Sequence, residues 1–146
     1  MYTIEEFDKE KVRVLKYILY KKRTEQEVRT KFSGEIEENL LEDIIEYLKE
    51  AKYINDKDYI EKAINNFMIL KNLSMREVQY KLIAKGLKKD DIEDYFYENR
   101  EKLEEYETKS ATNIIYKKSS SMELDEIKQY LLKKGYKLEN INKAIE

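Results

Sequence analysis

Three stretches of the chain share one pattern of apolar and polar positions. Residues 24–32 (TEQEVRTKF), 74–82 (SMREVQYKL) and 123–131 (ELDEIKQYL) align without gaps. In each stretch a glutamate is followed by Val or Ile and, four residues further on, by Phe or Leu. Apolar residues four positions apart lie on one face of an α-helix. Three copies at a spacing of about fifty residues therefore predict an array of helical repeats.

Each copy is predicted to hold three helices, of which the aligned stretch is the second. The third helix of the first copy is expected from Ile36 to about Ala51. Tyr17, Phe67 and Tyr116 share one further column and are expected to be core residues. The other apolar positions of the first helices are Leu15, Ile18 and Leu19, then Ile60, Ile64 and Leu70, then Ile114 and Ile115. Those of the third helices are Leu40, Leu41, Ile44, Ile45 and Leu48, then Ile92, Tyr95 and Phe96, then Ile141 and Ile145.

The second helices carry start signals. Thr24 and Ser74 each have a glutamate three residues later, the capping-box pattern in which hydroxyl and carboxylate satisfy free amides of the first turn. The third copy has Glu123 at the aligned position, so one of the serines at 119–121 is expected to cap that helix.

Glycines and polar pairs predict where the helices end. Gly86 and Gly135 follow lysines and suit the left-handed residue that ends many helices, and Ser33-Gly34 serves the same purpose in the first copy. Asn55-Asp56 is the expected turn between the first two copies. Residues 99–109 contain no helix breaker, so a continuous or bent helix is expected there.

These elements predict an all-α fold of three tandem three-helix repeats in an elongated, curved array. A core of one such repeat is marginal alone, so neighbouring repeats are expected to pack on one another. The predicted division is a lead-in at 1–8, a first repeat at 9–56, a second at 57–105 and a third at 106–146.

Composition excludes most catalytic machinery. The chain has no cysteine, histidine, proline or tryptophan, so thiolate metal sites, imidazole ligands and the commonest general base are absent. It contains no phosphate-binding glycine motif, and its acidic clusters fit helix N-termini better than a metal site. We expect no enzymatic activity, no cofactor and no metal. No apolar run approaches the ~20 residues of a membrane span and no leader pattern is present, so a cytoplasmic protein is expected. We also expect the chain to be a monomer.

Charge is strongly segregated although the net charge is only −2. Segments 9–34, 57–89 and 106–137 carry +6, +5 and +3, whereas 35–56 and 90–105 each carry −6. Stacked repeats would thus present a basic stripe beside an acidic one, although an individual lysine is as often a solvated helix residue. The candidate binding residues of the basic stripe are Lys21, Lys22, Arg23, Lys71, Arg76, Lys85, Lys117, Lys118, Lys133 and Lys134. The candidate contact aromatics are Tyr20, Tyr80 and Tyr130.

Three segments resemble the RecX family. They are AKYINDKDYIEKAI at 51–64, SMREVQYKLIAKGL at 74–87 and QYLLKKGYKLENI at 129–141, and the resemblance covers nearly the whole chain from about residue 9. The first matches a Gly-Tyr-(Ile/Leu)-(Asn/Asp)-Asp segment of the family that leads into an aromatic-rich helix.

The resemblance implies a regulator of the bacterial recombinase RecA. Such a protein would bind the RecA filament on single-stranded DNA, in its groove, and inhibit strand exchange, ATP hydrolysis and co-protease activity. Two alternatives stay open on the residues alone. One is a sequence-independent nucleic-acid-binding protein, whose affinity would fall steeply with salt. The other is a helical-repeat scaffold for a different protein, which the repeat pattern supports equally well.

Overall fold

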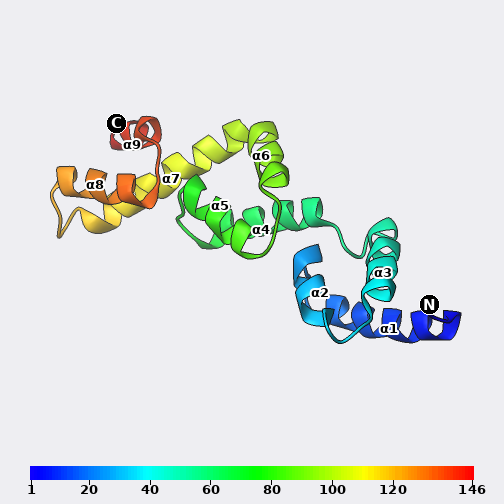
Figure 1. The fold of residues 1–146 in the computed structure, drawn as a ribbon. Coiled ribbons are helices and arrows are strands. Elements are labelled where there is room, and N and C mark those ends of the chain that lie inside the picture. Colours follow the sequence, from blue (N-terminus) through cyan, green and yellow to red (C-terminus); the bar gives the residue numbers. More distant parts are fainter.

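The computed structural model describes residues 1–146 and is built from helices alone. The nine helices are α1 (Ile4–Tyr20), α2 (Glu25–Phe32), α3 (Glu38–Glu50), α4 (Asp56–Leu70), α5 (Met75–Ala84), α6 (Lys89–Glu98), α7 (Arg100–Lys118), α8 (Leu124–Lys134) and α9 (Leu138–Ile145). They follow one another along an elongated body in chain order (Figure 1). The predicted all-α class is confirmed.

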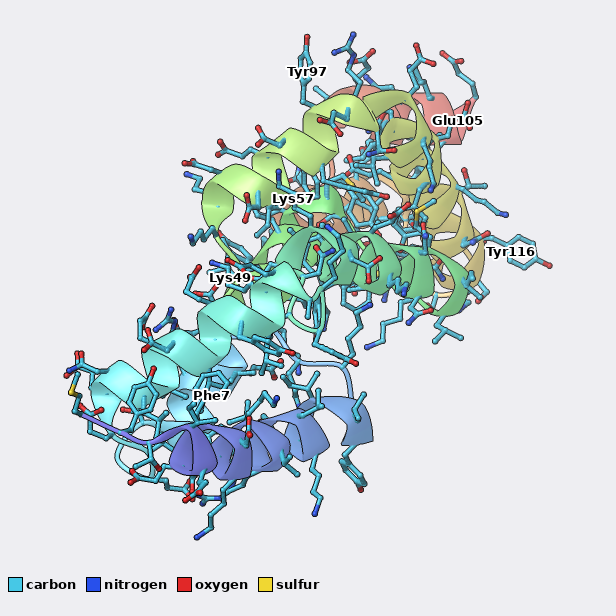
Figure 2. All side chains as sticks on the ribbon, turned by 90° about the vertical axis from the view of Figure 1, so that its right-hand side faces the viewer. Phe7, Lys49, Lys57, Tyr97, Glu105 and Tyr116 are labelled. Carbon is cyan, nitrogen blue, oxygen red and sulfur yellow. The ribbon has the colours of Figure 1, made fainter.

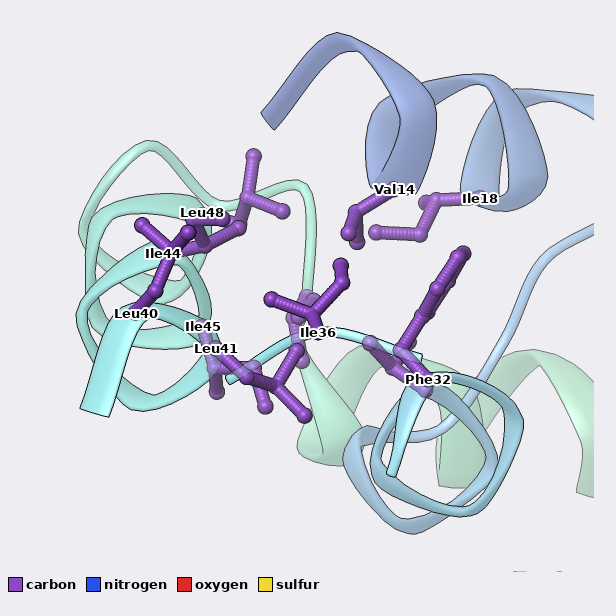
Figure 3. Close-up of a cluster of buried hydrophobic side chains, with 11 residues drawn as sticks. Val14, Ile18, Phe32, Ile36, Leu40, Leu41, Ile44, Ile45 and Leu48 are labelled. Atoms are coloured by element: carbon purple, nitrogen blue, oxygen red, sulfur yellow. The ribbon is translucent and has the colours of Figure 1, made fainter. Parts of the chain in front are cut away.

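The helices enclose three separate apolar cores in series. The first is formed by α1, α2 and α3 and includes Val14, Phe32 and Ile44 (Figure 3). The second lies among α4, α5, α6 and the beginning of α7, and the third lies among the rest of α7, α8 and α9. Because each core is small, only 31 of the 146 residues are buried. We call α1–α3, α4–α6 and α7–α9 the first, second and third repeats.

Helix α7 belongs to two cores at once. Its residues Leu103 and Tyr106 are buried in the second core, whereas Ala111 is buried in the third. The chain bends at Asn99, which lies between α6 and α7 and donates a side-chain hydrogen bond to the carbonyl of Tyr95. The boundary predicted between residues 105 and 106 therefore falls inside a helix that joins two repeats.

The predicted starts of the second helices are confirmed in the first two repeats, and the glycines predicted after the second helices are confirmed in all three. Thr24 and Ser74 each form a complete capping box at the start of α2 and α5. The three glycines, Gly34, Gly86 and Gly135, all have positive φ after those second helices. Capping boxes and glycines act on backbone groups within a few residues, so the sequence alone predicts these helix boundaries.

The predicted serine cap of α8 is wrong. Glu123 is the N-cap residue of α8, and no side chain accepts a hydrogen bond there. The hydroxyls of Ser119 and Ser121 instead donate to the carbonyls of Tyr116 and Lys118. The last carbonyls of a helix have no partner within the helix, and these serines are close enough in the chain to satisfy them.

Three residues expected in the cores are on the surface. Leu19, Leu70 and Tyr116 lie near the C-terminal ends of α1, α4 and α7, and they are 67%, 76% and 83% exposed. Each of these helices continues past the last residue that its neighbours cover. Tyr17 and Phe67 of the shared column do pack against their cores.

The repeats are joined twice by the same contact. The Thr24 hydroxyl donates to the carbonyl of Lys85 at 2.7 Å, and the Ser74 hydroxyl donates to the carbonyl of Lys134 at 2.7 Å. Each capping residue of one repeat thus satisfies a carbonyl at the end of the second helix of the next repeat. We call these contacts the first and second latches, and the recurring sequence pattern supplies both halves of each.

Replacing Thr24 with alanine is expected to lower the free energy of unfolding by about 1–2 kcal/mol, because the capping bond and the latch bond are lost together. Urea unfolding followed by circular dichroism measures the loss. Thr112→Ala is the control, since that exposed hydroxyl bonds only to a carbonyl of its own helix. Equal effects of the two substitutions would show that the first latch adds no stability.

Candidate partner-binding surface

The two latches gather most of the predicted basic residues into two groups. Residues 21–23 directly precede Thr24, so they lie at the first junction with Lys85 of the next repeat. Lys71 and Arg76 flank Ser74, so they lie at the second junction with Lys133 and Lys134. Residues about sixty positions apart meet because each latch joins a helix start to a helix end.

The basic residues of the first junction are largely engaged within the chain. Lys22 forms an ion pair with Asp58, and the ammonium of Lys22 holds the pKa of that carboxyl below its usual value. The Nζ of Lys85 is 3.9 Å from a carboxylate oxygen of Glu27. The Arg23 guanidinium lies 4.1 Å from the centre of the Tyr17 ring. Lys21 is exposed and forms no ion pair, so it is the cation of this junction that stays free for a partner.

The second junction keeps its positive charge. Lys71, Arg76, Lys133 and Lys134 are exposed, and the ion pairs of the chain involve none of them. We call these four residues the second-junction cluster. Four uncompensated cations on one surface raise the local potential and attract anionic partners.

Lys117 and Lys118 lie at the end of α7, next to this cluster. Lys118 Nζ is 4.3 Å from the centre of the Tyr130 ring, and Lys134 Nζ is 5.6 Å from the centre of the same ring. Tyr130 is half-buried against the third core, and both ammonium groups lie near its ring. Of the three candidate aromatics, Tyr20 and Tyr80 are free on the surface, being 86% and 64% exposed.

A buried carboxylate holds the second junction together. Glu107 is completely buried, and its oxygens accept hydrogen bonds from the amides of Met75 at 2.7 Å and Lys137 at 2.8 Å. The side-chain amide of Asn140 donates to it as well, at 2.9 Å. These amides lie at the starts of α5 and α9, so one carboxylate of α7 satisfies two helix N-termini.

Tyr106 adds to this attachment. Its hydroxyl accepts from the amide of Leu73 at 3.0 Å and donates to the carbonyl of Lys71 at 2.7 Å. The loop that carries Lys71 and Ser74 is therefore tied to α7 on both sides of Leu73. This fixes the backbone on which part of the second-junction cluster stands.

The first junction is held by polar groups outside the cores. Asp56 accepts a hydrogen bond from the amide of Glu25 at 2.9 Å, and Lys22 of the first repeat forms an ion pair with Asp58 of the second. Burial raises the pKa of the Asp56 carboxyl, and the bond from Glu25 only partly offsets this effect. The first core contains no residue after Ile54, and no helix is shared across this junction. The two junctions thus differ in kind.

Sequence reasoning missed one group of surface residues, the apolar side chains at the ends of α1 and α4. They are Leu19 and Tyr20 in α1 and Ile69 and Leu70 in α4. Periodicity assigned Leu19 and Leu70 to the core because both continue the apolar face of their helices. Their exposure could have been predicted from their place at the end of a helix, because each pair directly precedes a basic residue and a polar break.

Comparison with known proteins gives consistent matches. The chain is 34% identical over 136 residues to the regulatory protein RecX of Staphylococcus carnosus, an alignment that spans 90% of this chain and 51% of the relative. It is 30% identical over 148 residues to RecX of Staphylococcus epidermidis, spanning 97% of this chain and 55% of that protein. The chain is a homologue of the RecX regulatory proteins. It spans about half the length of these curated RecX relatives.

Solved RecX structures have the same fold. The crystal structure of RecX from Lactobacillus salivarius superposes with a TM-score of 0.83 at 24% identity, covering 98% of this chain and 96% of that one. A second crystal structure of regulatory protein RecX gives a TM-score of 0.79 at 19% identity, covering 94% of this chain and 72% of that one. No sequence profile of a protein family matches the chain. The RecX relatives are named as regulatory proteins and not as enzymes.

None of the helices combines the length and the apolar character that crossing a membrane requires.

Proposed function

We propose that the chain regulates RecA by binding the RecA filament on single-stranded DNA, in the filament groove. Binding there inhibits recombinase, ATPase and co-protease activity, and so modulates DNA repair and the SOS response in the cytoplasm. The observation that carries the proposal is the 34% identity to a RecX regulatory protein across 90% of the chain. The chain acts as a monomer by occupying the groove, without a cofactor and without chemistry of its own.

The shape and charge of the molecule support this mode of action. An elongated array can follow a groove across several subunits of a filament, as repeat arrays do on extended partners. The second-junction cluster supplies free positive charge for phosphates or acidic side chains in such a groove. Lys22 and Lys85 of the first junction are already paired with carboxylates and contribute less.

The decisive experiment is the DNA-dependent ATPase rate of a cognate RecA on single-stranded DNA, titrated with the chain at fixed salt. A control titration measures binding to the same DNA without RecA. Falling ATPase with weak binding to bare DNA supports filament recognition. Unchanged ATPase contradicts the proposal. Tight binding to bare DNA would then favour the nucleic-acid-binding protein, and no binding would leave the scaffold.

Charge reversal should separate the second-junction cluster from the general charge of the chain. The double variant Lys71→Glu/Lys133→Glu is expected to need at least about fivefold more protein for half-maximal ATPase inhibition, because cations that meet an anionic partner become repulsive. Lys9→Glu/Lys16→Glu changes the net charge equally at exposed positions of α1 that form no ion pair. Equal loss in both variants would mean that only the net charge matters.

A further inference from the structure

Exposed apolar side chains recur near the end of the first helix of each repeat. The last two residues of α1 are Leu19 and Tyr20, and the last two of α4 are Ile69 and Leu70. Both pairs end four residues before the capping Thr24 or Ser74, so they are equivalent in the array. In the third repeat the exposed residue is Tyr116, in the last turn of α7, which aligns with Tyr17 and Phe67 and so lies two to three positions earlier in the pattern. These five residues, which we call the apolar row, are between 67% and 86% exposed.

The apolar row lies along one side of the molecule. In Figure 2, α1 and α4 run in the same direction and end on the right-hand side, where the labelled Tyr116 also projects outward. Tyr97, another exposed tyrosine, projects from a different edge. The row therefore presents apolar groups from all three repeats to one partner.

Folding does not account for this exposure. A chain that is 41% charged has polar residues available for these positions, yet five large apolar side chains stand in water. Repeated exposed apolar groups on one side of a protein mark an interaction surface. Three of them, Leu19, Ile69 and Leu70, are aliphatic and have no aromatic face, so base stacking does not explain them.

The charges around the apolar row define the partner. Basic residues directly follow the row in each repeat. They are 21–23 after α1, Lys71 after α4, and Lys117 and Lys118 after Tyr116. A second copy of the chain would bring like charges face to face at such a surface. Apolar groups bordered by cations are complementary to apolar pockets that carry acidic side chains at their rims.

We propose that the apolar row is the contact to the protein part of the partner, an acidic protein surface whose apolar pockets are repeated along an assembly. The proposal rests on the proposed function in that the assembly is the filament of recombinase subunits. In this proposal, contact with protein and attraction to phosphate are made by different residues. Aliphatic ends of α1 and α4 enter pockets between or within subunits, and free lysines of the second-junction cluster account for attraction to phosphate.

The test uses the full chain and a triple variant, Leu19→Ser/Ile69→Ser/Leu70→Ser, which leaves the lysines and tyrosines in place. Affinity is measured by fluorescence anisotropy for RecA-coated single-stranded DNA and, separately, for bare single-stranded DNA. The matched control is Ile4→Ser/Val12→Ser/Leu138→Ser, which removes three exposed aliphatic side chains outside the row. Circular dichroism verifies equal helix content in the three proteins.

We expect the row variant to bind the coated filament at least about tenfold more weakly, with unchanged affinity for bare DNA and no loss in the control. Wild-type-like filament binding by the row variant overturns this inference while leaving the proposed function intact. Equal losses for filament and bare DNA assign the row to nucleic acid and also overturn it. If the unmodified chain does not bind the filament, the proposed function fails and this inference fails with it.

Discussion

Glu107→Ala is expected to lower the free energy of unfolding by about 4 kcal/mol. The substitution removes an acceptor that three donors share, the amides of Met75 and Lys137 and the side-chain amide of Asn140. A buried donor without a partner costs about 1–3 kcal/mol, and water entering the vacated space restores part of the loss. Urea unfolding followed at 222 nm, the helix band of circular dichroism, measures the change.

Two further variants make this experiment specific. Glu105→Ala, two residues away on the exposed side of α7, should change stability by less than about 0.5 kcal/mol, because it removes neither burial nor a hydrogen bond. Glu107→Gln keeps the shape and one acceptor oxygen but turns an amide group toward a backbone donor, so an intermediate loss is expected. If Glu107→Ala were as stable as Glu105→Ala, the buried carboxylate would not be what joins α5 and α9 to α7.

Gly86→Ala and Gly135→Ala are each expected to destabilise the chain by about 3 kcal/mol, well beyond Gly34→Ala. All three glycines have positive φ, which costs an L-residue about 1–2 kcal/mol. A Cβ on Gly135 would also lie 2.6 Å from Arg76 Cβ, and one on Gly86 would overlap Gln26. No atom lies within 4 Å of the Cβ position of Gly34.

The difference between these glycine variants isolates packing across the junctions. The backbone penalty is common to all three, whereas the overlap occurs only where a second helix meets the next repeat. Thermal and urea unfolding of the three variants in parallel provide the measurement. Equal destabilisation of all three would mean that the repeats separate slightly at no cost and that the close approach has no energetic value.

Local sequence signals predicted most of the secondary structure. The capping boxes at Thr24 and Ser74 and the glycines after the second helices act within a few residues, so pattern and outcome agree. What links Thr24 to Lys85 could not be predicted in the same way. The same pattern occurs once in every copy. Which helix start contacts which helix end depends on how the copies pack on one another.

The errors in the predicted core have one physical origin. Periodicity identifies the face of a helix that is apolar, but it does not identify where the neighbouring helices stop covering it. Tyr116 shares a column with Tyr17 and Phe67, yet it is exposed, because the third core has 5 buried residues where the first two have 11 and 10.

The sequence identified candidate basic residues, but it could not show which of them are paired with carboxylates of the same chain. Lys22 is paired with Asp58, which lies 36 residues further along the chain, whereas Lys71 has no acidic partner. Both lysines lie between a first helix and the capping residue of the second helix, Lys22 two positions before Thr24 and Lys71 three positions before Ser74. Only the arrangement of the junctions distinguishes a neutralised lysine from one that a partner can reach.

The double membership of α7 determines where the chain can be divided for expression. A cut between Ile54 and Asp56 separates the first core from the second without splitting either, so a fragment beginning at Asp56 retains two complete cores. A cut after residue 105 would remove Tyr106 from the second core and Glu107 from the start of α5. The smallest fragment that keeps the second repeat intact is therefore a pair of repeats.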